Sequence, residues 1–108
     1  MKYLIEIEWN KTETFEAGRV VREYEFMPFI GMDLWIENTS EYDDIQYTDK
    51  WISEMNEGNP EHKIVDKKAE SISGKIVSVR FDEYFKKLWD SGEGAESAPF
   101  IIKIEPED

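Results

Sequence analysis

Residues 18–37, GRVVREYEFMPFIGMDLWIE, have the pattern of two β-strands joined by a connection that contains proline and glycine. In the first half, side chains of two kinds alternate, as on a strand whose successive residues point to opposite faces. Val20, Tyr24 and Phe26 share one face, and Arg22 lies on that face by parity. Because β-branched and aromatic residues fit a half-buried pleated surface, this half is predicted to be a strand with one face against the core.

The second half of this stretch is predicted to be another strand. Pro28 lacks a backbone donor and fixes φ, so the first strand is expected to end near it. Gly31 permits a tight bend before the second run begins. In that run Leu34 and Ile36 alternate with Trp35, which by parity faces away from them. Trp35 is therefore either exposed or covered by the segment that follows it.

The same alternation recurs elsewhere in the chain, most clearly in KYLIEIEW near the N-terminus. It indicates a half-buried antiparallel sheet, with one face packed and one face in water. In all, five strands are predicted, at residues 2–9, 19–27, 32–37, 75–81 and 99–105.

A long insert, residues 38–74, separates the third predicted strand from the fourth. Inside it, apolar residues recur at helical spacing and a Gly-Asn-Pro sequence gives a stop signal, which predicts a helix over about 43–57. Asp43 and Asp44 suit the N-terminus of that helix, where they would complement the helix dipole. A short helical turn is predicted over about 82–90.

These elements predict a mainly β fold with a minor α component, in a single domain spanning residues 1–108. Five short, twisted strands with one buried face tend to form a small antiparallel sheet or to curl into a half-open barrel. The order of elements resembles the SH3-like small-barrel group, a likeness of pattern that implies a fold type and no function. A ferredoxin-like α+β sheet is the alternative, because two helices alternate with the strands.

Net charge is the strongest compositional feature. The 108-residue chain carries −12, of which residues 33–61 contribute −8 through nine acids and one base. Binding to a phosphate backbone needs clustered Lys and Arg, so direct nucleic-acid binding is disfavoured. A basic protein partner would instead be attracted and steered. The acids also fit a simpler role, which is to keep a small domain soluble.

Several chemistries find no support in the sequence. There is no cysteine and one histidine, His62, in a polar stretch, so thiolate chemistry, a histidine-based catalytic triad and a nitrogen or sulfur metal site are not expected. No glycine-rich phosphate motif follows a strand. We therefore predict no catalytic residue, no metal and no cofactor, and we expect a protein that is not an enzyme. No run is apolar and long enough to span a membrane, and no signal peptide is apparent, so a cytoplasmic location is expected.

Aromatic side chains among acids give the leading hypothesis for a binding surface, because Trp and Tyr dominate interface hot spots. We expect a non-catalytic, acidic protein-binding module that engages a basic protein partner, resembling inhibitors such as immunity proteins or phage anti-defence proteins. The residues predicted to meet the partner are Trp35, Glu41, Tyr42, Asp43, Asp44, Tyr47, Asp49, Trp51 and Glu54.

Two alternatives remain open. A small molecule or nucleotide would bind at the open end of a small barrel, with Arg22, Tyr24 and Arg80 as the candidate ligand-binding residues. In a structural or assembly subunit, exposed strand edges would pair with further copies of the chain. The sequence leaves the oligomeric state open.

Overall fold

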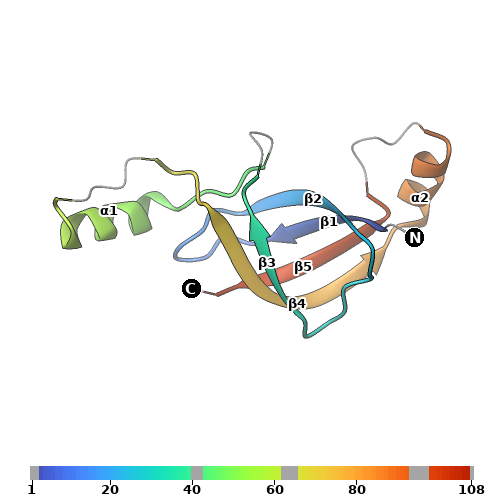
Figure 1. Cartoon of the computed structure of the whole chain (residues 1–108), viewed down its shortest axis with the longest axis horizontal. Coiled ribbons are helices and arrows are strands. Elements are labelled where there is room, and N and C mark those ends of the chain that lie inside the picture. The colour runs from blue at the N-terminus through green and yellow to red at the C-terminus, as the bar shows by residue number, and fades with distance from the viewer. Residues whose placement is uncertain (1–2, 40–42, 62–65, 93–97, 108) are drawn as a thin grey trace.

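The computed structural model describes residues 3–39, 43–61, 66–92 and 98–107 (Figure 1). It confirms the predicted mainly β fold: a five-stranded sheet curls into a half-barrel and is accompanied by two short helices. In chain order the elements are β1 (Tyr3–Trp9), β2 (Gly18–Tyr24), β3 (Asp33–Glu37), α1 (Asp49–Gly58), β4 (Ser71–Phe81), α2 (Glu83–Asp90) and β5 (Phe100–Pro106).

The strand order is β2-β1-β5-β4-β3, so β2 and β3 are the two edges of the sheet. The pairs β1–β2, β3–β4 and β4–β5 are antiparallel, as predicted, whereas β1 and β5 run parallel. Alternation alone could not reveal this, because it reports which face of a strand is buried and not the direction of its neighbour. β5 turns back antiparallel to β4 by way of α2 and thereby comes to lie beside β1.

β4 forms the corner of the half-barrel. Its first part, from Ser71 to Lys75, pairs with β3, and its second part, from Gly74 onward, pairs with β5. A register shift between Ile76 and Ser78, just after the two parts overlap, bends the strand. The backbone of β5 passes so close to Gly74 that an added Cβ would lie 2.8 Å from the carbonyl carbon of Glu105. The predicted start of this strand at residue 75 was four residues late, since Gly74 interrupts the apolar alternation.

Isoleucines dominate the core on the concave side of the sheet. The most completely buried of them come from β1, β3, β4 and β5 and from the segment before α1: Ile5, Ile7, Ile36, Ile45, Ile72, Ile76, Ile102 and Ile104. Because these residues alternate with polar ones, the opposite face of each strand is exposed to solvent or covered by neighbouring side chains. The outward direction predicted for Trp35 follows from this alternation and is confirmed.

Helix α1 begins six residues later than predicted. Thr48 is its N-cap: the Thr48 side chain accepts a hydrogen bond from the backbone N–H of Trp51 and donates one to the carbonyl of Glu13. Before Thr48 the chain is extended, and Tyr47 pairs with Phe15 as an isolated bridge. Hydroxyl capping and this bridge fix the start of the helix, whereas the two aspartates had favoured an earlier one. α2 agrees with prediction, and the Asp82 carboxylate accepts a hydrogen bond from the N–H of Phe85.

α1 extends beyond the end of the half-barrel (Figure 1), which contributes to overall dimensions of 52 × 28 × 20 Å. It contains no buried residue. The helix therefore does not cover the sheet, and the ferredoxin-like alternative, which would place both helices on one sheet face, does not describe this architecture.

Candidate functional site

Trp35 stands on the outer face of edge strand β3 and is 69% exposed. Its cross-strand neighbour on β4 is Ser73, whose small side chain leaves the indole uncovered. Asp33 and Glu37 flank Trp35 on the same face, and both are exposed. No ion pair joins either carboxylate to another described residue, although Lys75 lies opposite Asp33 on β4. The surface of β3 is thus an exposed indole between two unneutralised acids.

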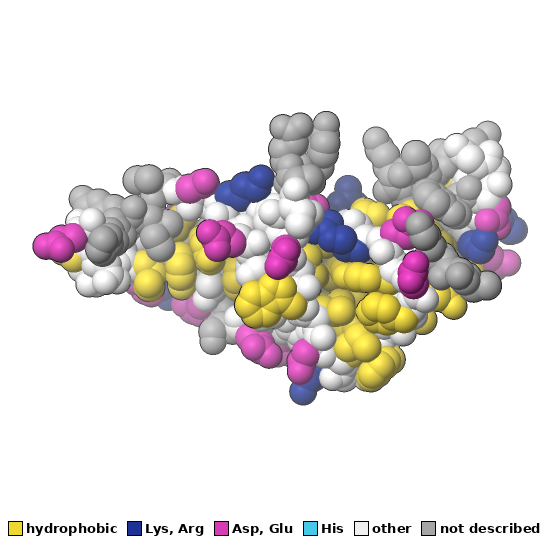
Figure 2. Space-filling model, in the orientation of Figure 1, with side chains coloured by type: hydrophobic (Ala, Val, Ile, Leu, Met, Phe, Trp, Pro, Cys, Tyr) yellow, Lys and Arg dark blue, Asp and Glu magenta, His cyan; other side chains and the backbone are white. Residues whose placement is uncertain are grey.

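The connection between β2 and β3 adds further exposed apolar side chains. Phe26, Phe29 and Ile30 are all exposed, and Phe26 contacts the ring of Tyr24 with centroids 5.2 Å apart. Figure 2 shows hydrophobic side chains gathered over β3 and below β2 on this face, with several acidic side chains around them. Large exposed apolar patches on small proteins mark interaction surfaces, so this face is the strongest candidate for binding.

Arg22 ties the two edges of the half-barrel together. From β2, its guanidinium donates to the backbone carbonyl of Val21 at 3.0 Å and to that of Glu37, at the end of β3, at 2.8 Å. The same group forms a two-pronged pair with the Asp43 carboxylate, at 3.0 and 2.6 Å. We call this set of contacts the Arg22 clasp.

The Arg22 clasp is shielded from solvent. The side chains of Arg22 and Asp43 are 22% and 8% exposed. The hydrogen bond to Asp43 raises the pKa of Arg22 above its usual value, although burial opposes this rise. Asp43 also accepts a hydrogen bond from the backbone N–H of Thr39. Parity had placed Arg22 on the inner face, and an arginine facing inward was the available signal that it needed a partner.

The structure separates the predicted partner-binding residues into distinct groups. Glu41 and Tyr42 lie outside the described residues, as does His62. Asp43 belongs to the Arg22 clasp, where its carboxylate pairs with Arg22 and its side chain is 8% exposed. Asp44 is exposed before α1, and Glu54 is exposed on α1.

Tyr47 and Trp51 anchor the base of α1. Their rings stack at 4.0 Å, and Tyr47 also stacks on the buried ring of Phe15 at 5.6 Å. Two exposed ion pairs flank this stack, Lys50 with Glu13 at 2.7 Å and Lys67 with Asp49 at 2.5 Å. Tyr47 and Trp51, which had suggested a binding surface in this segment, therefore pack against each other, and Tyr47 packs against Phe15, at the base of the helix. Trp35 is the predicted anchor that the structure leaves exposed.

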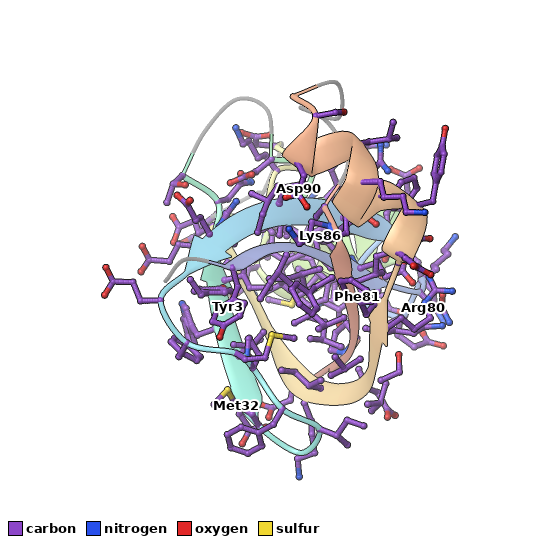
Figure 3. The ribbon with its side chains drawn as sticks, turned by 90° about the vertical axis from the view of Figure 1, so that its right-hand side faces the viewer. Tyr3, Met32, Arg80, Phe81, Lys86 and Asp90 are labelled. Atoms are coloured by element: carbon purple, nitrogen blue, oxygen red, sulfur yellow. The ribbon has the colours of Figure 1, made fainter. Side chains whose placement is uncertain are left out.

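The residues of the alternative ligand site do not converge. Arg22 and Tyr24 lie on the inner face of β2, and burial raises the pKa of Tyr24 above its usual value. Arg80 lies on β4 on the outer side of the sheet, where its guanidinium is 4.0 Å from the Glu8 carboxylate (Figure 3). Tyr3, Met32 and Phe81 lie around the open end of the half-barrel in the same view. This end is largely aromatic, and Arg22 is occupied by Asp43.

A surface hollow of about 630 Å³ at the base of α1 is lined by both charges, including Lys11, Glu13 and Lys50. Its lysines already face acids: Lys50 meets Glu13 at 2.7 Å and Lys11 meets Glu16 at 3.7 Å. A phosphate would have to compete with these carboxylates for each cation. The hollow therefore gives the nucleotide alternative no specific support.

Among residues 3–39, 43–61, 66–92 and 98–107, no group of three or more His, Asp or Glu side chains is arranged to hold a metal ion. No helix within these ranges has the length and apolar character required to cross a membrane. Comparison of the chain with protein-family models, with curated proteins and with solved structures finds no match.

Proposed function

We propose that this chain is a non-catalytic, acidic protein-binding module of the inhibitor type, as immunity and anti-defence proteins are, and that it engages a basic protein partner through the face centred on Trp35. The observation that carries the proposal is the exposed Trp35 indole between the unneutralised carboxylates of Asp33 and Glu37. A tryptophan is costly to leave in water, and tryptophan is enriched among the residues that dominate binding energy.

The charge of the chain supports the choice of partner. With a net charge of −12, the protein would attract a basic surface from a distance, and Asp33 and Glu37 would place that attraction next to the apolar contact. The apolar connection between β2 and β3 would provide the rest of the buried area. Buried apolar contacts would supply affinity, and the acids would raise the association rate and select for a basic partner.

The test compares two exposed aromatic residues on different elements. Trp35→Ala removes the proposed anchor, while Tyr84→Ala removes a side chain of similar exposure, 65%, from α2. The two variants and the parent protein are immobilised and incubated with host lysate at low and moderate salt. We expect a basic protein to be retained by the parent and by Tyr84→Ala, and to be lost from Trp35→Ala. Loss of a hot-spot residue costs at least about 2 kcal/mol, or roughly thirtyfold in affinity. Equal retention by both variants, or no retained protein, would contradict the proposal.

The described geometry gives less support to the nucleotide and assembly alternatives. A nucleotide would need cations that are not already engaged, and Arg22, the candidate on the inner face of the half-barrel, is held by Asp43. A thermal-shift screen with nucleotides checks this alternative directly, since a tight ligand raises the melting temperature by mass action. Light scattering checks the assembly alternative.

A further inference from the structure

We propose that the partner binds as an extended, lysine-bearing strand that adds to the free edge of β3 along the backbone of Asp33 and Trp35. This inference rests on the proposed function and specifies how the partner would be recognised. Strand addition of this kind obtains affinity from main-chain hydrogen bonds and selectivity from alternate side chains.

The backbone of β3 presents unpaired groups along part of its free edge. The N–H of Asn38 donates to the carbonyl of Glu70 at 2.8 Å, and the N–H of Ile76 donates to the carbonyl of Met32 at 2.9 Å. Hydrogen-bonded pairs alternate in an antiparallel ladder, so Leu34 and Ile36 direct their backbone groups toward β4. The N–H and C=O of Asp33, Trp35 and Glu37 then point to the free edge.

The Arg22 clasp sets one limit of this edge. Arg22 already donates to the Glu37 carbonyl at 2.8 Å, which agrees with the outward direction of that carbonyl. At the other limit, the N–H of Gly31 donates to the carbonyl of Ile76. Two residues remain between these limits, Asp33 and Trp35, and they offer two N–H donors and two carbonyl acceptors to an added strand.

The side chains of β3 specify the chemistry of the added strand. On the outer face, Asp33, Trp35 and Glu37 follow one another at intervals of about 7 Å, the spacing of every second residue in a strand. A strand with lysines four positions apart, and a neutral residue midway between them opposite Trp35, would set its charges opposite the two acids. On the inner face Leu34 and Ile36 point to the core, so the intervening residues of the added strand should be apolar.

A second copy of this chain is a poor occupant. Antiparallel pairing of β3 with its own copy around Trp35 would place Asp33 opposite Glu37 of the other molecule, twice. Like charges directly opposite each other destabilise a strand pair. The same two acids favour a basic strand, so charge complementarity selects a partner of opposite sign.

The first experiment titrates the full-length, ¹⁵N-labelled protein with a capped peptide that contains Lys-Val-Thr-Val-Lys, in which Thr would lie opposite Trp35. We expect chemical-shift changes centred on β3 and slower amide exchange, by about tenfold or more, at Asp33 and Trp35. The Glu37 end should change less, because Arg22 remains bound there. A control peptide with glutamates in place of the lysines should bind at least about tenfold more weakly.

The second experiment removes backbone hydrogen bonds without removing side chains. A peptide methylated on its Thr amide can no longer donate to the Trp35 carbonyl, and we expect its affinity to fall by about tenfold. In the protein, Trp35→Pro removes the outward N–H, whereas Trp35→Ala keeps it. Because that N–H does not serve the pairing with β4, an edge proline is compatible with the strand. Circular dichroism confirms the fold, and Trp35→Pro should bind the lysine peptide more weakly than Trp35→Ala.

The outcomes distinguish this inference from the proposed function. If the lysine peptide fails to bind, or binds equally well when methylated, strand addition is wrong. Retention of a basic partner that depends on Trp35 would then leave the proposed function in place. If the lysate experiment also returns no partner that depends on Trp35, both fail. Should Trp35→Pro not fold, the methylated peptide still decides the question on the parent protein.

Discussion

The two ends of β3 differ in whether the backbone groups at its free edge have a partner within the protein. At Glu37 the exposed edge is occupied by the protein itself, because Arg22 reaches across from β2 and takes the backbone carbonyl. At Asp33 and Trp35 the described structure provides no such cover, and an indole stands exposed beside the open backbone. Unpaired edges invite association, and proteins usually protect them. The contrast suggests that the Glu37 end serves stability and that the Trp35 end is kept for a partner.

Breaking the Arg22 clasp should cost the most stability. Arg22→Ala removes the guanidinium that pairs with the shielded Asp43 carboxylate and its hydrogen bonds to two backbone carbonyls. Removing one member of a buried pair costs about 3 kcal/mol or more in the free energy of unfolding. Arg19→Ala is the matched control on the same strand, since Arg19 pairs with Glu6 at 3.0 Å but its side chain is 73% exposed. It should cost less than about 1 kcal/mol.

Urea denaturation of the two arginine variants measures this difference. Equal losses for Arg22→Ala and Arg19→Ala would mean that the clasp contributes no more than an ordinary surface pair. The contrast between the two ends of β3 would then lose its structural basis.

A smaller effect is expected at the base of α1. Thr48→Ala removes a cap that serves both the helix and the carbonyl of Glu13, and caps of this kind contribute about 1 kcal/mol. Asp44→Ala should change the unfolding free energy little, because the helix begins at Asp49 and Asp44 is exposed. Amide exchange of residues 49–58 reports the loss locally. Faster exchange in the Asp44 variant than in the Thr48 variant would indicate that the helix begins near Asp43, as the sequence predicts.

The next effect is a dependence on pH. Burial raises the pKa of Tyr24 above its usual value of 10.0, so the folded state holds the phenolic proton more tightly than the unfolded state does. This contribution to stability is complete below pH 10 and is lost as the pH rises through the pKa of the folded state. Tyr24→Phe should therefore lose less stability than the parent between pH 9 and pH 11, as measured by urea denaturation. Identical pH profiles would contradict the partly buried position of this ring.

The smallest effect on stability is expected for Trp35→Ala. An exposed side chain with a serine as its cross-strand neighbour contributes within about 0.5 kcal/mol. Thermal or urea denaturation should therefore place this variant close to the parent, even though we expect it to lose its partner. A loss of more than about 1 kcal/mol would indicate that Trp35 is part of the packing and weaken the case for a binding role.

Local pattern allowed much of the β architecture to be predicted, because alternation identifies strands and faces directly. The outward direction of Trp35 and the inward direction of Arg22 both followed from parity. The partner of Arg22 did not, since Asp43 lies 21 residues away and is brought to β2 only by the fold. The local pattern assigns Asp43 to the binding surface because it does not reveal this long-range contact with Arg22. The start of α1 was missed because Asp43 and Asp44 carry the same local signal as a true cap, and the Tyr47–Phe15 bridge that overrides it is a long-range contact.

Residue-resolved amide exchange along β3 shows whether the backbone of Asp33 and Trp35 is open to an added strand. We expect Leu34 and Ile36, bonded to β4, to exchange at least about tenfold more slowly than Asp33 and Trp35, whose N–H groups face the free edge. Rapid exchange at Trp35 beside slow exchange at its two neighbours would establish the open edge to which a partner strand can add. Exchange at Trp35 as slow as at Leu34 would mean that this edge is already covered, and strand addition at β3 would then be wrong.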